Sequence, residues 1–181
     1  DYVVTKVPRF AFEKFRGSPA VLTTAMKSVG EAMAIGRCFE ESFQKALRSL
    51  ETGLSGWGGD RPEPSCSKID LERSLRTPSP DRILAVRSAM LSGMTDDRIY
   101  ELSNIDPWFL TKLRGLIDTE SELLNGRSLE ELDESTLFKL KSLGYSDRQI
   151  AWFVDSKELN VRERRYQLGV MPVFKTVDTC A

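Results

Sequence analysis

Three pairs of adjacent acidic residues are the groups in this chain best suited to chemistry, because paired carboxylates can serve as general acid and base. The pairs are Glu40-Glu41, Asp96-Asp97 and Glu130-Glu131. Each pair falls in the first turn of a predicted helix, where the positive end of the helix dipole stabilises negative charge. The dipole is sufficient to explain all three pairs, and we assign none of them to catalysis.

The sequence lacks the signatures of nucleophilic, metal and phosphate chemistry. It contains no histidine, the commonest general base and metal ligand in proteins. A cluster of four glycines, Gly53, Gly56, Gly58 and Gly59, follows a predicted helix and precedes a Pro-rich run. A phosphate-binding loop needs the opposite order, from a strand through a loop to a helix N-terminus. We therefore predict no catalytic residue, no cofactor-binding residue and no metal ligand.

The charges of the chain are nearly balanced, with 26 Lys and Arg against 27 Asp and Glu and a net charge of −1. This balance disfavours a general nucleic-acid binder or a polybasic membrane surface. No apolar run approaches the roughly 18 residues of a membrane span. We therefore expect neither nucleic acid nor a membrane as a partner. The N-terminal cations could bind a phosphate, but a role as solvated charges at the ends of strands is favoured. These cations are Lys6, Arg9, Lys14 and Lys27.

The three cysteines, Cys38, Cys66 and Cys180, are far apart in the sequence and lack metal-ligand spacing. This pattern favours buried or incidental thiols in a reducing compartment.

Residues 1–36 favour β-structure, and a helix follows them. Residues 3–7 form one strand-like run, whereas the run 29–35 fits either a second strand or the start of a helix. From Arg37 onward, apolar residues recur at helical spacing, and Gly53 is the predicted stop. The apolar stripe of this helix is Phe39, Phe43, Ala46, Leu47 and Leu50.

Residues 53–80 are rich in Gly, Pro and Ser, which predicts a loop with one short helix over 69–76. Trp57 is costly to leave in water, so a docked loop and a surface excursion are equally favoured.

After residue 80 the sequence is dense in helix caps, which predicts an all-α region. The longest predicted helix has Phe109, Leu113, Leu116 and Ile117 on its buried face. The predicted helix starts are Ser79-Pro80, Thr95, Asp106-Pro107, Ser128 with Glu131, Ser146 with Gln149, and Asn160 with Glu163; the stops are Gly93, Asn125-Gly126 and Gly169.

A weak internal repeat lies inside this region. Gly93-Met94-Thr95-Asp96 followed by Ile99 matches, 51 residues later, Gly144-Tyr145-Ser146-Asp147 followed by Ile150. In both copies glycine ends one helix and Ser or Thr caps the next, as in a helix–turn–helix unit. A stand-alone helical DNA-binding regulator is therefore an alternative function, with Arg162–Gln167 as its basic reading helix. Packed α-hairpins use the same turns, and the acidic residues around 130–134 favour that interpretation.

Long stretches of the sequence closely resemble carbamoyl-phosphate synthase large chains. The end of the family's first ATP-grasp unit and the entry into its helical oligomerisation domain resemble DYVVTKVPRFAFEKF, LTTAMKSVGEAMAIGR and FEESFQKALRSLE. The helical middle of that domain is similar to SNIDPWFLTKLRGL, and the exit strand into the second synthetase half is similar to GVMPVFKTVDTCA. The resemblance spans the chain in order and is weakest over residues 53–68.

The resemblance implies three parts and a mainly α fold class. Residues 1–36 would be a short β-containing remnant of the first ATP-grasp domain. Residues 37–170 would be the multi-helix oligomerisation domain, with its loop at 53–80. Residues 171–181 would be a truncated C-terminal strand that starts the second synthetase half. We expect the chain to be a piece of a longer protein.

The resemblance also implies an enzyme, an ATP-dependent ligase that makes carbamoyl phosphate from bicarbonate, glutamine-derived ammonia and two ATP. The product feeds arginine and pyrimidine synthesis, and a glutaminase small chain supplies the ammonia. The parent enzyme would use ATP with Mg²⁺ or Mn²⁺ and K⁺, bound outside this piece. It would work in the cytoplasm, or in the plastid stroma of a plant. The piece alone is expected to be inactive.

The expected role of the piece itself is that of a rigid connector and self-association module. A multi-helix domain is stiffer than a Gly/Ser linker, and its outer surface can offer a two-fold patch to a second copy. Bulky residues at predicted turns or helix starts are the interface candidates, although core packing would explain each of them as well. They are Trp108, Tyr145 and Trp152. A small self-sufficient enzyme is a further alternative, disfavoured by the missing histidine and phosphate loop.

Overall fold

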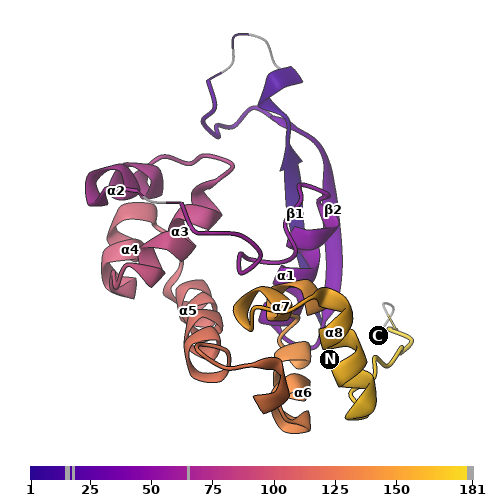
Figure 1. The fold of residues 1–181 in the computed structure, drawn as a ribbon. Helices are drawn as coiled ribbons and strands as arrows, with labels where there is room; N and C mark the ends of the chain where they lie inside the picture. The colour runs from indigo at the N-terminus through magenta and orange to yellow at the C-terminus, as the bar shows by residue number, and fades with distance from the viewer. Residues whose placement is uncertain (15–16, 18, 65, 179–181) are drawn as a thin grey trace.

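A two-stranded antiparallel hairpin begins the chain and packs against a body of helices (Figure 1). The computed structural model describes residues 1–14, 17, 19–64 and 66–178. Strand β1 covers Val3–Phe10 and β2 covers Ser28–Gly36, with Val3 opposite Gly36. The ambiguous run 29–35 is thus a strand. Its pairing with β1 satisfies the backbone N–H and C=O groups that a lone strand would leave to water.

Helix α1, Phe39–Ser49, packs on this hairpin. The Thr5 hydroxyl lies 2.7 Å from that of Ser42, and the Lys45 ammonium donates to the carbonyl of Ile35 at 3.2 Å. The predicted apolar stripe is confirmed, with Phe43, Ala46 and Leu47 buried and its two end members partly buried. The helix ends earlier than predicted, because Glu51 already adopts the left-handed conformation with φ of +55°.

Seven further α-helices follow in the described residues, and they agree with the predicted mainly α class. Two short 3₁₀ helices cover Phe12–Lys14 and Leu129–Glu131. The α-helices are α2 (Lys68–Arg76), α3 (Arg82–Leu91), α4 (Asp96–Ser103), α5 (Pro107–Leu123), α6 (Glu134–Ser142), α7 (Asp147–Phe153) and α8 (Glu158–Gln167).

Most of the predicted caps are confirmed. The side chains of Thr95, Asp106 and Ser146 each accept a hydrogen bond from a backbone N–H in the first turn of the following helix. Capping boxes form at Ser128 and Ser146. These caps satisfy N–H groups that have no partner inside the helix.

Two predicted helix starts are wrong. Helix α3 begins after Asp81, not at Ser79-Pro80. Asn160 lies inside α8, whose N-cap is Lys157, and its amide donates to the Ser156 hydroxyl at 3.3 Å. The buried residues of α8, Val161 and Arg165, lie one helical turn apart on the same face.

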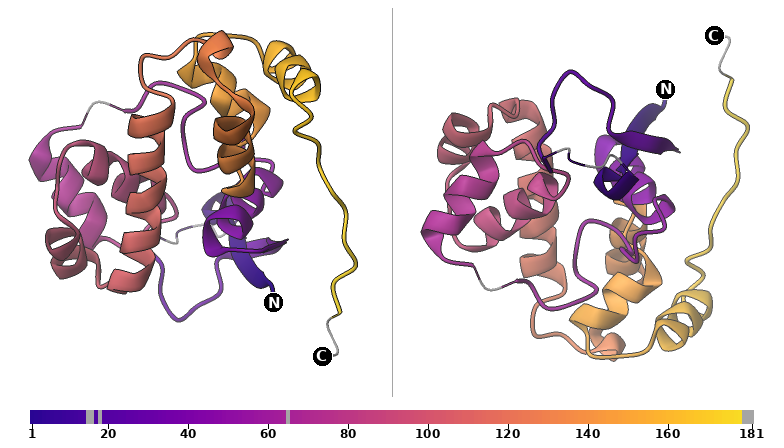
Figure 2. Two further views of the ribbon diagram at one scale, coloured as in Figure 1. Left: turned by 90° about the horizontal axis from the view of Figure 1, so that it is seen from below. Right: turned by 90° about the horizontal axis from the view of Figure 1, so that it is seen from above.

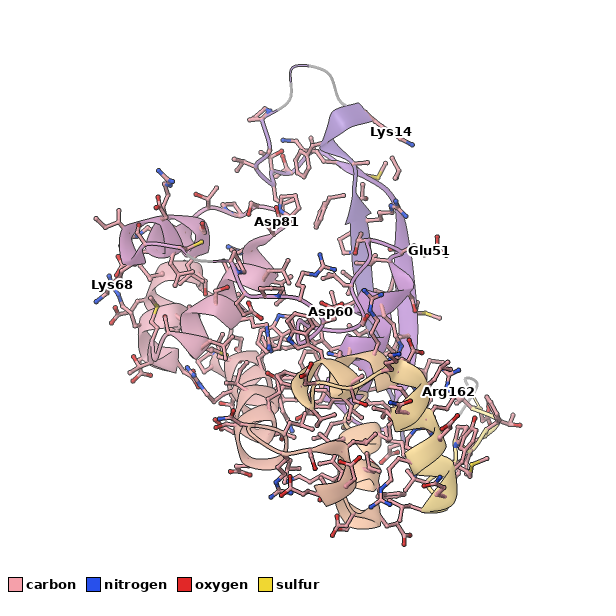
Figure 3. All side chains as sticks on the ribbon, viewed as in Figure 1. Lys14, Glu51, Asp60, Lys68, Asp81 and Arg162 are labelled. Atoms are coloured by element: carbon pink, nitrogen blue, oxygen red, sulfur yellow. The ribbon has the colours of Figure 1, made fainter. Side chains whose placement is uncertain are left out.

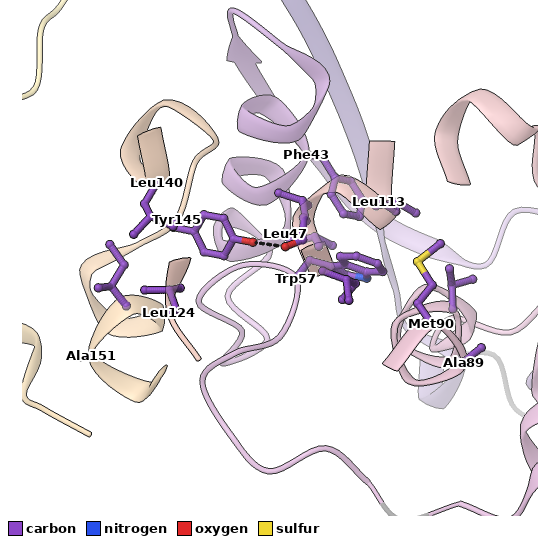
Figure 4. Packing of buried hydrophobic residues seen from close by; sticks show 14 of the residues in the cluster. Phe43, Leu47, Trp57, Ala89, Met90, Leu113, Leu124, Leu140, Tyr145 and Ala151 are labelled. Atoms are coloured by element: carbon purple, nitrogen blue, oxygen red, sulfur yellow. Dashed lines mark hydrogen bonds between the residues drawn. The ribbon is translucent and has the colours of Figure 1, made fainter. Parts of the chain in front are cut away.

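The hydrophobic core lies between the helices and includes the segment that precedes α2. Trp57 is 1% exposed, so the loop is docked, and its ring lies edge-on to that of Phe43 with centroids 6.0 Å apart. Figure 4 shows Trp57 inside the cluster, with Leu47 on one side and Met90 on the other.

The buried face of α5 differs from the prediction at one residue. Leu110 is fully buried, whereas Phe109 is 42% exposed. Its ring turns instead toward Phe39 and Trp108 at the surface, at centroid distances of 5.4 and 5.0 Å. The other predicted members of this face, Leu113, Leu116 and Ile117, are buried.

The predicted C-terminal strand does not form in residues 171–178, which have no regular secondary structure. Figure 2 shows this segment extending away from the helices. A strand needs a neighbouring strand to complete its hydrogen bonds, and the sheet of the described residues consists of β1 and β2 without this segment. Residues 179–181, and with them Cys180, lie outside the described residues.

Candidate functional site

Six of the eight α-helices in the described residues form two three-helix units related by an offset of 51 residues. Unit one is α3, α4 and α5, and unit two is α6, α7 and α8; each helix of unit two begins within one residue of the offset position. The turns agree in conformation. Gly93 and Gly144 have φ of +84° and +88°, and Asn104 and Asp155, which follow the middle helices, have φ of +55° and +47°. The weak sequence repeat is therefore a structural repeat.

A pair of ion pairs extends the repeat beyond the residues noticed in the sequence. In unit one, Arg114 donates to Asp96 Oδ1 from Nε and Nη2, at 3.0 and 2.6 Å. In unit two, Arg165 donates to both carboxylate oxygens of Asp147 at 2.8 Å. Sequence reasoning found the two aspartates but missed the arginines. The signal was present, because the same offset of 51 separates Arg114 from Arg165.

Asp147 is the centre of a group of paired charges at the turn between α6 and α7. Burial raises the pKa of this carboxyl, but the bonds from Arg165 and Lys141 outweigh it and leave the pKa below the ordinary value. Burial also lowers the pKa of the Lys141 ammonium, which donates to Asp147 at 2.9 Å and to the carbonyl of Tyr145 at 2.6 Å. The buried charges at this turn are thus paired, as burial requires.

The Gly-rich residues 53–63, which we call the central segment, pass between the two units. Figure 3 shows Asp60 of this segment near the middle of the molecule, and its carboxylate accepts a bond from the Ser55 N–H at 2.7 Å. Toward unit one, the indole N–H of Trp57 donates to the carbonyl of Ile83 at 2.9 Å. Toward unit two, the carbonyl of Gly58 accepts a bond from Gln149 at 2.8 Å. The glycine cluster therefore has a packing role.

Buried polar side chains complete the connection between the units. Arg87 of α3 binds both carboxylate oxygens of Glu120 at 2.9 and 2.7 Å, and it also donates to Glu63 of the central segment at 2.6 Å. Glu120 accepts a further bond from the Tyr145 hydroxyl at 3.2 Å. Burial raises the pKa of the Glu120 carboxyl and holds the pKa of the Tyr145 phenol well above its ordinary value. Gln149 also donates to Gln44 of α1 at 2.9 Å.

The structure separates the three interface candidates. Tyr145 is fully buried, and its hydroxyl donates to the carbonyl of Leu116 at 2.9 Å; its assignment to an interface is corrected to a core role, because one copy of the chain already encloses it. Trp108 and Trp152 are 51% and 47% exposed. They come from α5 and α7, and both remain predicted contact residues.

Helix α8 does not present the free basic face that DNA reading would need. Arg165 is bound to Asp147, and Arg164 donates to the carbonyls of Glu130 and Leu132 at 3.1 and 3.3 Å. Arg162 pairs with Glu158 at 2.6 Å. These three arginines are bound to other groups of the chain, which favours the packing interpretation of the repeat.

The metal-binding side-chain types and the carboxylate pairs were located in the described residues. Within them, no group of three or more His, Cys, Asp or Glu side chains is arranged to hold a metal ion. Of the carboxylate pairs, Glu41 accepts a hydrogen bond from the Arg37 N–H at 2.7 Å, and Glu131 completes a capping box.

A groove of about 580 Å³ beside α2 is lined by polar and apolar side chains, including Cys66, Lys68 and Arg98. No helix in the described ranges is both long and apolar enough to cross a membrane.

Comparison with known proteins gives a consistent result. A family model described as the oligomerisation domain of the carbamoyl-phosphate synthetase large chain matches residues 31–169. The carbamoyl phosphate synthase large chain of Nostoc is 60% identical over 181 residues, which cover all of this chain and 16% of the relative. The arginine-specific large chain of Arabidopsis thaliana, a chloroplastic protein, is 55% identical over 189 residues, covering all of this chain and 15% of the relative. In Neisseria meningitidis the large chain is 51% identical, with 16% of it covered.

The chain thus spans about a sixth of the length of the curated relatives it matches. Because the family model covers well over half of its residues, and the relatives align along its whole length at 51–60% identity, the chain belongs to the carbamoyl-phosphate synthetase large-chain family and contains its oligomerisation domain.

Proposed function

We propose that this chain is the rigid connecting and self-association module of a carbamoyl-phosphate synthase large chain. The observation that carries the proposal is the match of residues 31–169 to the family's oligomerisation domain. A second copy of the large chain is the proposed partner, and the exposed Trp152 and Trp108 are the candidate contact residues.

Rigidity is supported by the way the two units are joined. The central segment is hydrogen-bonded to both units through Trp57 and Gly58, and the Tyr145 hydroxyl of unit two donates to Glu120 of unit one at 3.2 Å. These buried links between the units support a rigid spacer that holds two catalytic regions at a fixed separation.

In this proposal the full-length protein is an ATP-dependent ligase that makes carbamoyl phosphate from bicarbonate, glutamine-derived ammonia and two ATP. Its ATP-grasp regions would hold ATP with Mg²⁺ or Mn²⁺ and K⁺ outside this chain, and a glutaminase small chain would supply ammonia. The product would serve arginine and pyrimidine synthesis, in the cytoplasm or in the plastid stroma. The 181-residue chain alone would be inactive.

Sedimentation equilibrium of the chain at low and high salt tests self-association. A concentration-dependent dimer that persists in high salt is expected, since an apolar interface is little screened by ions. The Trp152→Ser variant then asks whether α7 lies in the interface. A chain that stays monomeric at high concentration would contradict the self-association role and leave the spacer role alone.

A further inference from the structure

Residues 19–27, which we call the strap, run from the far end of the hairpin back into β2 and lie against the loop between α2 and α3 (Figure 1). The Leu22 N–H of the strap donates a hydrogen bond to the carbonyl of Pro78 in that loop at 2.6 Å. The end of the strap is tied to the hairpin, since the Ala11 N–H donates to the Lys27 carbonyl at 3.1 Å. The hairpin therefore reaches the helices both through α1 and through the strap.

The last residue of the strap, a lysine, points inward. Lys27 is 8% exposed, whereas the apolar Met26 beside it is 77% exposed. The sequence favoured Lys27 as a solvated charge at a strand end, and this prediction is wrong. An ammonium is costly to bury unless it is bound to other groups, so the partners of Lys27 decide why it lies here.

The Lys27 ammonium binds the opposite end of the strap. It donates to the carbonyls of Val21 and Pro19 at 2.7 and 3.2 Å. It also lies 5.5 Å from the centroid of the Phe12 ring, next to the hairpin, and the ring face attracts a cation. Hydrogen bonds from a charged donor are stronger than those between neutral groups. Lys27 therefore holds the two ends of the strap together.

One peptide group connects Lys27 to the α2–α3 loop. The Val21 carbonyl and the Leu22 N–H belong to the same planar peptide group. The ammonium binds this group at its oxygen, and the Pro78 carbonyl accepts a bond from its N–H. A cation at the carbonyl end polarises the group and makes its N–H a better donor. The two bonds therefore strengthen each other.

We propose that Lys27 holds the strap on the α2–α3 loop, so that the hairpin moves together with α2 and α3. The strap lies outside residues 31–169, which match the family's oligomerisation domain, whereas Pro78 lies within them. A displacement of the hairpin would thus reach the start of α3 without passing through α1. This inference rests on the proposed connecting function and does not involve self-association.

Amide hydrogen exchange tests the role of Lys27. The Lys27→Met variant keeps an unbranched side chain but removes the charge. We expect exchange of the Leu22 N–H to accelerate by about tenfold or more, while the N–H of Leu113, buried in α5, keeps its rate. Lys6→Met is the matched control, because Lys6 is an exposed hairpin lysine paired with Glu31 at 2.8 Å, and it should leave the Leu22 rate unchanged.

Two exchange results would overturn the proposal. An unchanged Leu22 rate in Lys27→Met would show that the ammonium does not hold the strap. Equal acceleration at Leu22 and Leu113 would show that Lys27 supports the whole fold and has no particular effect on the strap.

Distances between nitroxide labels test whether the strap couples the hairpin to the helices. Labels on Lys14→Cys, at the far end of the hairpin, and Lys68→Cys, on α2, report on the two parts (Figure 3); the native cysteines are replaced by serine. We expect Lys27→Met to broaden this distance distribution. A label pair on Lys68→Cys and Asp118→Cys, both on helices, is the control and should keep its distribution.

An unchanged distribution between the hairpin and α2 labels in Lys27→Met would overturn the coupling. Loss of self-association in sedimentation, by contrast, would contradict only the proposed self-association role and would leave the strap as it is.

Discussion

Asp147 occupies in unit two the place that Asp96 occupies in unit one. Each is the first residue of a middle helix, and each is bound by an arginine 18 residues later in the chain. Their surroundings differ, since the Asp96 side chain is 32% exposed and that of Asp147 is 7% exposed. The same local arrangement therefore has a different energetic weight in the two units.

Replacing the two aspartates should show this difference. Asp147→Asn leaves the buried Arg165 without its charge partner, and we expect a loss of about 3 kcal/mol in the free energy of unfolding. Asp96→Asn affects a partly exposed pair and should cost about 1 kcal/mol. Urea unfolding of both variants measures the two losses. Equal losses would contradict a closed ion pair in unit two.

The stability of the chain should fall in acid through Asp147. Its pKa is lowered in the folded chain relative to the ordinary value of 3.8, so the unfolded chain takes up the proton first. The stabilisation of the folded chain by ionised Asp147 is therefore complete at pH values above the pKa of the unfolded chain. It is lost as the pH falls through the pKa of the folded chain.

Urea midpoints measured from neutral pH to pH 3 would show the effect as a decline that is steeper for the parent than for Asp147→Asn. Parallel curves for the two proteins would mean that another carboxylate carries the acid sensitivity.

Gly58 should tolerate no side chain. Its φ is +80°, and an added Cβ would meet the guanidinium of Arg87. Strain at a left-handed position together with displacement of that buried arginine should cost about 2 kcal/mol or more. Gly115, inside α5 with open space around it, is the matched control, and Gly115→Ala should gain about 0.5–1 kcal/mol. Thermal unfolding compares the variants, and a neutral Gly58→Ala would show that the central segment is not closely packed.

Helix caps can be tested with one pair of substitutions. Ser146 accepts a bond from the Gln149 N–H at 3.2 Å, and Ser146→Ala should cost about 1 kcal/mol. Asn160 caps nothing, so Asn160→Ala should stay within about 0.5 kcal/mol of the parent. The free energies of unfolding of the two variants, measured with a denaturant, test this difference. A larger loss at Asn160 would restore the predicted cap at that residue.

Local features of the fold were predictable because their causes lie within a few residues. The caps at Thr95, Asp106 and Ser146 depend on a side chain that binds a backbone N–H two or three positions later. The helical spacing of Phe43 and Leu47 required only the period of the helix. The prediction failed at Asn160 because several helix starts within one turn satisfy the local pattern, and the structure begins α8 after Lys157.

The sequence by itself determined the helical class, most helix boundaries, the repeat at its turns and the family of the chain. The helices and their caps depend on hydrogen bonds and apolar spacing among residues that are close together in the sequence. Only the tertiary structure decided which bulky residues face water. Tyr145 and Trp57 are enclosed, whereas Trp108 and Phe109 are half exposed. Burial depends on segments that are distant in the sequence, such as the central segment between units one and two, and no local pattern contains that information.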